Sequence, residues 1–267
     1  MNSEVQISAG RAVSILPGAT RGIRAVASIM GMPVSVHIVD AAAEGDAEMV
    51  FDYLRHIDRV FSTYKPDSET ERIDRGELSV TDSSEEMRTV IALCEKTRLE
   101  TGGYFNARYR GRFDPSGIVK GYAIRQASEF LRERGFRDFF VEAGGDIQTS
   151  GRNARGEEWR VGIRDPFNVS GLFSAVRLSG DAIATSGVYE RGDHIYDPVE
   201  GRPANAVASL SVIAPDVYDA DRFATAAFAM GERGIHFIEV TPGLEGCVVG
   251  WDRRAHCTTG FQKYLSP

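Results

Sequence analysis

The chain has 267 residues, of which 42% are hydrophobic and 26% are charged, and 31 Lys and Arg against 38 Asp and Glu give a formal net charge of −7. This is the composition of a folded globular protein, and it excludes a chain that is mainly disordered. Because the balance is acidic and the basic residues are scattered, nucleic acid and anionic membrane surfaces are disfavoured as partners.

The N-terminal region of the sequence predicts a cytoplasmic location and two strands, not a membrane span. The first ten residues contain no basic segment, no continuous apolar run and no cysteine for lipid attachment. We therefore expect a cytoplasmic protein whose first residues, about 20 in number, form an extended strand or arm. The most apolar stretch, Ala25 to Val39, is interrupted by Gly31, Pro33 and polar residues, and it is too short to span a bilayer. It predicts two strands around a bend.

The cysteines predict no disulfide framework. Cys94, Cys247 and Cys257 contain no C-x-x-C pair, and an odd number cannot close completely into disulfides. We expect reduced thiols.

Four segments have the apolar periodicity of amphipathic helices. Ser83 and Glu86 have the spacing of a capping box at the start of the second segment. Glycines follow the second and third segments, where helices commonly end. The expected helices run from Ala47 to about Tyr64, from Ser83 to the stop at Gly102, from Ile118 to the stop at Gly135, and from about Ala220 to Met230.

After Gly135 the chain changes to short β-prone runs bounded by Gly, Pro and Asp. Strands and helices are mixed without strict βαβ alternation, and no repeat or linker is visible. The sequence predicts a single compact α+β domain over residues 1–267, with mixed helices and largely antiparallel sheets. The expected strands are Phe139–Val141, Trp159–Ile163, Leu172–Leu178, Ala208–Ala214 and Cys247–Trp251.

The first candidate for chemistry is the segment from Phe113 to Gly121, in which Asp114, Ser116 and Lys120 surround a Gly-containing helix start. Small residues at a helix N-terminus let backbone groups approach an anion. The alternative is that Asp114 or Ser116 only caps the helix and Lys120 points to solvent. The segment is not a Walker loop, which needs G-x-x-x-x-G-K-[ST].

Two further segments are rich in turn-forming and polar residues. Gly144-Gly145-Asp146 follows a strand, and a hairpin or bulge explains it without any ligand. The stretch from Ala184 to Arg191, continued by 194–198, is typical of a ligand-facing loop. His194 in it could serve as a base or be structural. The G-x-S-x-G pattern of a hydrolase elbow is absent.

Asp221 and Thr225 are four residues apart on the last expected helix, so their oxygens share one face. Such a pair of hard oxygens can hold Mg²⁺. The alternative is that Asp221 favours the helix dipole and Thr225 bonds a backbone carbonyl.

Taken in order, these segments resemble the FAD:protein FMN transferase family, the ApbE-like flavin transferases, over most of the chain. The resemblance implies an ApbE-like, T-fold-related domain. The matching stretches are Met30 to Pro33, Phe61 to Tyr64 with Ser68-Glu69, Thr101 to Phe105, Asp114 to Gly121, Ala143 to Ile147, Ala184 to Arg191, His194 to Pro198 and Asp221 to Gly231.

The resemblance implies an enzyme that cleaves the pyrophosphate of FAD, attaches FMN through a phosphoester to a Thr or Ser of an acceptor flavoprotein, and releases AMP. It implies Mg²⁺, with Mn²⁺ as the alternative ion, held by Asp221, Thr225 and the carbonyl of Gly117. It assigns His194 as general base and the main chain of Ile195 to the flavin. The implied FAD contacts are Met30, Tyr64, Tyr104, Phe105, Asn106, Asp114 and Lys120.

Two features depart from the family pattern. Asn106 stands where members often have Asp, and only residues 107–113 connect it to the following helix, which is shorter than usual. Asn keeps the hydrogen-bonding shape and loses the charge. An FAD hydrolase that gives FMN and AMP, and a non-catalytic flavin-binding protein, remain alternatives. The acceptor is not identified.

Overall fold

The computed structural model describes residues 14–15, 22–109, 111–188 and 195–266, and in these residues it contains a nine-stranded sheet. Every neighbouring pair of strands in this sheet is antiparallel. The strands, in spatial order, are β1 (Ser14–Ile15), β2 (Ile23–Ile29), β3 (Met32–Ile38), β6 (Phe139–Ala143), β7 (Asp146–Ser150), β10 (Ala182–Gly187), β13 (Ser209–Ala214), β14 (Glu245–Val249) and β15 (Ala255–Cys257).

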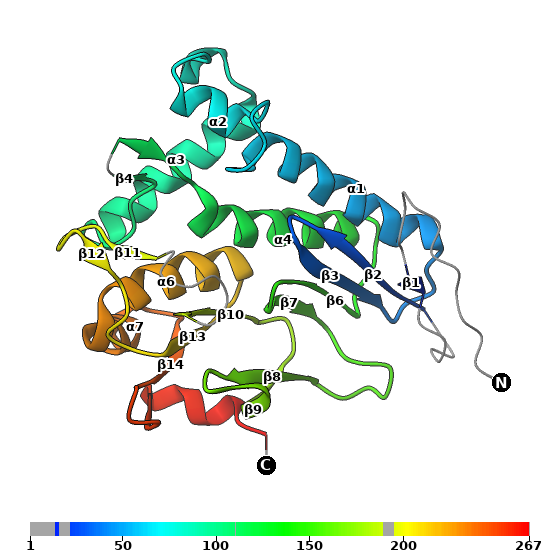
Figure 1. Cartoon of the computed structure of the whole chain (residues 1–267). Helices are drawn as coiled ribbons and strands as arrows, with labels where there is room; N and C mark the ends of the chain where they lie inside the picture. Colours follow the sequence, from blue (N-terminus) through cyan, green and yellow to red (C-terminus); the bar gives the residue numbers. More distant parts are fainter. Residues whose placement is uncertain (1–13, 16–21, 110, 189–194, 267) are drawn as a thin grey trace.

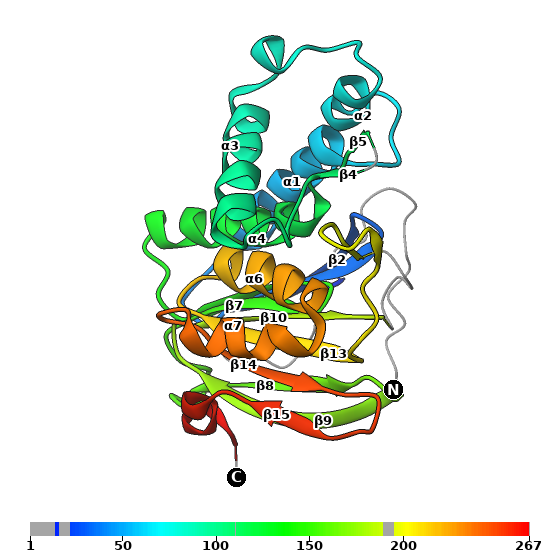
Figure 2. The ribbon, with the colours of Figure 1, turned by 90° about the vertical axis from the view of Figure 1, so that its left-hand side faces the viewer.

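Helices cover one face of the sheet, with α4 between α1 and α6 (Figures 1 and 2). α1 packs on β2 and β3, α4 on β6 and β7, and α6 on β10 and β13. In the described part of the chain, no helix has both the length and the apolar character needed to cross a membrane. The helices are α1 (Glu44–Phe61), α2 (Glu69–Asp74), α3 (Glu85–Glu100), α4 (Ser116–Glu133), α6 (Val217–Ala229) and α7 (Gly234–Val240), with 3₁₀ turns at Val80–Asp82, Gly231–Arg233 and Thr259–Tyr264.

The other face carries the hairpin of β8 (Trp159–Asp165) and β9 (Asn168–Leu178) together with the C-terminal 3₁₀ turn. Successive side chains of a strand point to opposite faces. Accordingly Val212 belongs to the core beneath α6, whereas its neighbour Ile213 belongs to the core shared with Val176 of β9 and Phe261. β13 is buried at every position, including Ser209 and Ser211, because layers cover both of its faces.

The α+β prediction is confirmed, and the four predicted helices are present as α1, α3, α4 and α6. The N-cap of α3 is Ser84, whose hydroxyl accepts a hydrogen bond from the Met87 N–H at 3.1 Å. The predicted capping role of Ser83 is therefore wrong by one residue. α2 and α7 have only six and seven residues, too few to show helical periodicity in the sequence.

The predicted bend within 25–39 is the β2–β3 turn, but the predicted loop from Ala184 is partly wrong. Its first residues, through Gly187, belong to β10. The polar side chain of Thr185 is accommodated there because its hydroxyl shares a 2.8 Å hydrogen bond with Ser211 on β13. Residues 189–191 of that segment lie outside the described residues.

The expectation of three reduced thiols is wrong for two of them. Cys247 and Cys257 are directly opposite each other across β14 and β15 and form a disulfide. Counting cysteines could not show this pairing, because it depends on strand register. Cys94 is free, and burial raises the pKa of its thiol to about 12.

Two very small hairpins flank the helical layer. One pairs β4 (Arg108–Tyr109) with β5 (Arg112–Phe113), and the other pairs β11 (Tyr196–Asp197) with β12 (Arg202–Pro203). The two hairpins touch through the rings of Tyr109 and Tyr196, whose centroids are 5.0 Å apart. Together they close one side of the cavity described next.

Candidate active site

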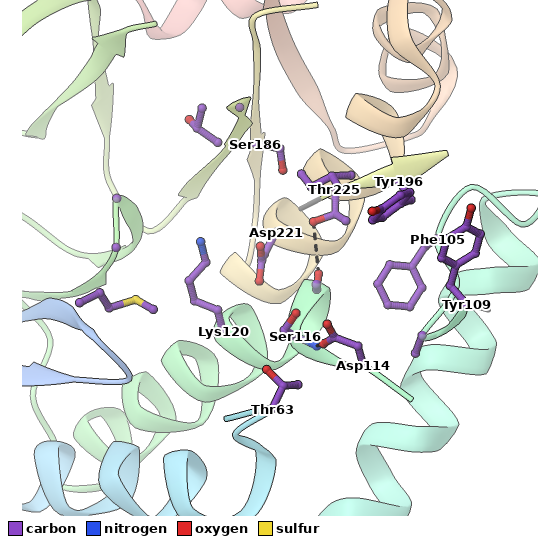
Figure 3. A pocket seen from close by; sticks show the side chains of 18 of the residues that line it. Thr63, Phe105, Tyr109, Asp114, Ser116, Lys120, Ser186, Tyr196, Asp221 and Thr225 are labelled. Atoms are coloured by element: carbon purple, nitrogen blue, oxygen red, sulfur yellow. Dashed lines mark hydrogen bonds between the residues drawn. The ribbon is translucent and has the colours of Figure 1, made fainter. Parts of the chain in front are cut away.

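A cavity of about 860 Å³ is lined by the β2–β3 turn, the segment after α1, the start of α4, the β6–β7 turn, the end of β10, β11 and α6. This volume is in the range of small-molecule sites, roughly 300–1,000 Å³. Figure 3 shows side chains from these separate elements pointing into one space. Ten of the twelve predicted site residues line it: Tyr64, Tyr104, Phe105, Asn106, Asp114, Gly117, Lys120, Ile195, Asp221 and Thr225.

The start of α4 presents its backbone to this cavity. The Asp114 Oδ1 atom accepts a hydrogen bond from the Ser116 N–H at 2.9 Å, next to the N-cap residue Pro115, and Asp114 also lines the cavity. A Cβ atom on Gly117 would come within 3.0 Å of Phe105 Cε2 and 3.2 Å of Thr225 Cγ2. Glycine therefore lets the α4 backbone approach both side chains closely.

α6 crosses α4 at a second glycine. A Cβ atom on Gly121 would lie 2.7 Å from the Asp221 Cβ, so only glycine allows this approach. The Gly121 N–H donates to Asp221 Oδ2 at 2.7 Å, and the Thr225 hydroxyl donates to the Gly117 carbonyl at 3.3 Å. The crossing thus brings the three predicted metal ligands together (Figure 3).

Lys120 and Asp221 line the base of the cavity, and Asp146 lies behind them against Lys120. We call these three side chains the charged floor. Lys120 Nζ lies 2.8 Å from Asp146 Oδ2, and its side chain is 20% exposed, so it does not point to solvent. Burial, and next the negative charge of Asp146, raise the pKa of Asp221 to about 8. Lys120 and the Gly121 N–H act against this shift.

The donor atoms suit a hard divalent cation. Within the described residues, no three His, Cys, Asp or Glu side chains gather as a metal cluster. The available ligands are one carboxylate, one hydroxyl and one backbone carbonyl, all oxygens, which is the chemistry that Mg²⁺ prefers when substrate phosphates and water complete its shell. The residues therefore fit the predicted ion.

Phe105, Tyr109 and Tyr196 lie together on one side of the cavity (Figure 3). With Tyr104, which also lines the cavity, we call them the aromatic wall. Phe105 is buried, whereas Tyr196 is 36% exposed. The rings of Tyr109 and Tyr196 are inclined at 32° to each other. The Tyr104 hydroxyl accepts a hydrogen bond from Arg233 at 2.5 Å. Flat apolar surfaces of this kind can hold the ring system of a nucleotide.

Met30 is one predicted contact that does not line the cavity. It occupies the β2–β3 turn at φ 55° and packs against the main core, while Gly31 and Met32 of the same turn face the cavity. Tyr64 lines the rim and is 85% exposed, so the alternative that it is simply an exposed side chain also describes it.

The remaining predicted residues are placed as follows. The Asn106 Oδ1 atom accepts a hydrogen bond from the Arg108 N–H at 2.9 Å, so it shapes its own turn. The Ile195 side chain is buried, and its carbonyl accepts a hydrogen bond from the Ala204 N–H at 2.9 Å. His194 lies outside the described residues, and its role as general base stays a prediction.

Sequence reasoning missed several residues of the site. Tyr109 and Tyr196 carry no pattern of their own, because their contact depends on two hairpins that are distant in the chain. The sequence singled out Asp146 only as part of a turn. The turn is present, because Gly144 and Gly145 both have positive φ between β6 and β7. Its ion pair with Lys120 requires knowledge of how β7 packs on α4.

Comparison with known proteins gives a consistent picture. The family model described as the ApbE family matches residues 30–112 and 107–248. A FAD:protein FMN transferase of Vibrio cholerae is 33% identical over 166 residues, which cover 57% of this chain and 50% of that protein. One of Rhodobacter capsulatus is 38% identical over 130 residues, covering 45% of this chain and 24% of that protein. Among these curated relatives the matched stretch thus spans half of their length or less.

Solved structures share the fold. The ApbE protein of Thermotoga maritima superposes with a TM-score of 0.82 at 23% identity, covering 92% of this chain and 100% of that one. The flavin transferase ApbE of Vibrio cholerae gives a TM-score of 0.80 at 22% identity, covering 92% and 99%.

Proposed function

The chain belongs to the ApbE family, and we propose that it is a Mg²⁺-dependent flavin transferase. It cleaves the FAD pyrophosphate, attaches FMN to a Thr or Ser hydroxyl of an acceptor flavoprotein and releases AMP. The observation that carries this proposal is the convergence of the Gly117 carbonyl, Asp221 and Thr225 beside Lys120, in a cavity of about 860 Å³. Phosphoryl transfer needs this combination of positioning and positive charge.

The chain's own residues divide the work. Lys120 faces the phosphate oxygens and offsets the charge that builds up on them. The aromatic wall orients a ring of the dinucleotide, so that its pyrophosphate lies over the charged floor. Asp221, Thr225 and the Gly117 carbonyl would hold Mg²⁺, which would supply further charge neutralisation at the phosphoryl oxygens. In the transfer itself the acceptor oxygen bonds to the FMN phosphorus, the bond from that phosphorus to the AMP oxygen breaks, and the acceptor proton passes to His194.

The test is an incubation of the protein with FAD and Mg²⁺, with and without a peptide bearing a Ser/Thr-Gly-Ala-Thr-type acceptor motif. We expect AMP and an FMN-modified peptide to appear together and both to disappear with EDTA. AMP without modified peptide would mean that water replaces the acceptor and that the chain is an FAD hydrolase. FAD binding with no AMP in either tube would overturn the enzymatic proposal.

His194→Ala tests the base. We expect transfer to fall by about a hundred-fold or more, the usual contribution of a general base. His236→Ala is the matched control, because His236 is exposed on α7 and does not line the cavity. Transfer at the wild-type rate by His194→Ala would remove that residue from the mechanism.

A cytoplasmic location stays part of the proposal, and one feature of the molecule opposes it. The Cys247–Cys257 disulfide is of a type that persists mainly in oxidising compartments. Thiol alkylation of the protein directly after cell lysis distinguishes a cytoplasmic location from an oxidising compartment. A cytoplasmic protein should carry alkyl groups on both Cys247 and Cys257, whereas a disulfide would block both.

A further inference from the structure

We propose that Asp146 is a positioning residue that anchors the Lys120 ammonium beside Asp221 and is not itself a metal ligand. This proposal rests on the proposed function, because it assigns Lys120 to the phosphates of a dinucleotide. Four observations carry it: the placement of Asp146 by its turn, its burial, the partners of its two oxygens and the charge balance of the floor.

The β6–β7 turn places Asp146 behind the cavity. Gly144 and Gly145 adopt φ of 56° and 92°, which favours glycine at both positions. A Cβ atom on Gly144 would lie 2.7 Å from Met32 Sδ, so the turn is also packed tightly against β3. Asp146 follows as the first residue of β7 and is only 1% exposed.

Both carboxylate oxygens of Asp146 face donors. Oδ1 accepts a hydrogen bond from the Thr185 N–H at 3.1 Å, and Oδ2 lies 2.8 Å from Lys120 Nζ. Lys120 and Asp221 line the cavity, whereas Asp146 does not. A metal ligand has to present an oxygen to the site, so this arrangement is that of an anchor for Lys120.

The charge balance explains why an anchor is useful. Lys120 can pair with either buried carboxylate, and pairing with Asp221 would occupy an oxygen needed for the cation. The 2.8 Å contact with Asp146 Oδ2 holds the ammonium at that carboxylate, while Asp221 Oδ2 accepts a hydrogen bond from the Gly121 N–H at 2.7 Å. When both carboxylates are ionised, they and the one ammonium leave one net negative charge, which a divalent cation can neutralise.

The first experiment needs no substrate. Acetic anhydride labelling followed by mass spectrometry measures the reactivity of each of the four lysines in one sample. We expect Lys120 to react at least about ten-fold more slowly than the other three lysines, because its ion pair is with a buried carboxylate, whereas their ion pairs are exposed and open readily in water. Asp146→Asn should raise the Lys120 rate to within about three-fold of theirs, since Asn keeps the Thr185 bond and loses the charge. The internal controls are Lys65, Lys96 and Lys263.

The second experiment is a double-mutant cycle with Lys120→Met, reading Mg²⁺ and FAD affinity by calorimetry. Asp146→Asn alone should weaken FAD binding by about ten-fold, because the ammonium is no longer held at the phosphates. In the Lys120→Met background the same substitution should change neither affinity by more than about two-fold. A further loss of Mg²⁺ affinity in that background would show that Asp146 is a ligand, and would overturn the proposal.

The melting temperature of each variant is measured to check that it folds. Asp40→Asn is the matched control, because Asp40 also accepts backbone hydrogen bonds, from Arg137 and Asp138, and does not line the cavity. Should Asp146→Asn alone fail to fold, the double variant still decides. An anchor role predicts that Lys120→Met lowers the melting temperature, since it leaves a buried charge unpaired, and that adding Asp146→Asn restores it. Lys120→Met melting like the wild type would contradict the anchor.

The two proposals fail separately. Protected Lys120 in a protein that transfers no FMN would leave the anchor in place and remove the proposed function. FMN transfer by a protein whose Lys120 labels as fast as Lys65 would support the proposed function and remove the anchor role of Asp146.

Discussion

The charged floor and the aromatic wall lie in one cavity but are built in opposite ways. The floor is formed by α4 and α6, which cross at glycines, and by the first residue of β7, and its carboxylates are 1% and 5% exposed. The wall includes Tyr109 and Tyr196, which sit in strands of two residues and meet through their rings. The floor is therefore held rigidly by packed elements, whereas the Tyr109–Tyr196 part of the wall depends on two small hairpins.

If this comparison is right, the largest effect comes from the floor. Asp221→Asn removes the charge of the proposed metal ligand but keeps an oxygen able to accept from the Gly121 N–H. We expect FMN transfer to fall by at least about a hundred-fold, because a metal ion contributes several kcal/mol to charge stabilisation. The control is Asp52→Asn, which changes an exposed acid on α1. Activity within about three-fold of the wild type would show that the floor is not the chemical centre.

The second prediction concerns pH and uses the metal-free protein. The folded-state pKa of Asp221 is raised to about 8, above the ordinary value of 3.8, so the folded state holds this proton more tightly than the unfolded chain. Stability should therefore fall as pH rises from about 4 to 8, and the full loss is reached above the raised pKa. Differential scanning calorimetry at pH 5 and pH 8 should show a drop in melting temperature that Asp221→Asn reduces by several °C. Equal drops in the two proteins would mean that another group is responsible.

The floor and the wall also differ in how far they could be predicted from sequence. α1 and α4 were predicted because each buries one helical face, which leaves a clear periodicity. β10 was missed and taken for a loop because it is buried on both faces and carries Thr185 and Ser186, whose polarity is accommodated inside the sheet. The polarity of a short segment does not show whether layers cover both faces of the strand that it forms.

The same limit applies within the site. Asp221, Thr225 and Gly117 were found through spacing on a helix and through the family resemblance, and the structure brings them together. The Lys120–Asp146 pair and the Tyr109–Tyr196 contact join distant segments through tertiary packing, which no local motif encodes. The disulfide was missed for the same reason, since it depends on the register of β14 and β15.

The third prediction tests the wall. Tyr196→Ala removes one ring of the Tyr109–Tyr196 contact from an exposed hairpin. We expect the KM for FAD to rise about ten-fold with kcat changed by less than about three-fold, because loss of ring stacking costs about 1–3 kcal/mol in binding. Steady-state kinetics at saturating Mg²⁺ measure both constants, and Val199→Ala in the turn between β11 and β12 is the control. A fall in kcat with unchanged KM would place Tyr196 with the floor instead.

The smallest effect is expected at Asn106, where the chain departs from the family pattern. Asn106→Asp restores the charge and keeps an oxygen for the Arg108 N–H, so the turn should not change. Asn106 lies on the partly exposed side of the cavity, where water and salt screen a single charge and its effect is below about 1 kcal/mol. The KM for FAD should therefore change by less than about three-fold. The change should be smaller still at about 0.5 M salt, where the Debye length is roughly half its value at physiological ionic strength and charges are screened more strongly. A change of ten-fold or more that survives high salt would mean that the wall recognises charge as well as ring surface, and would erase the distinction between the two halves of the cavity.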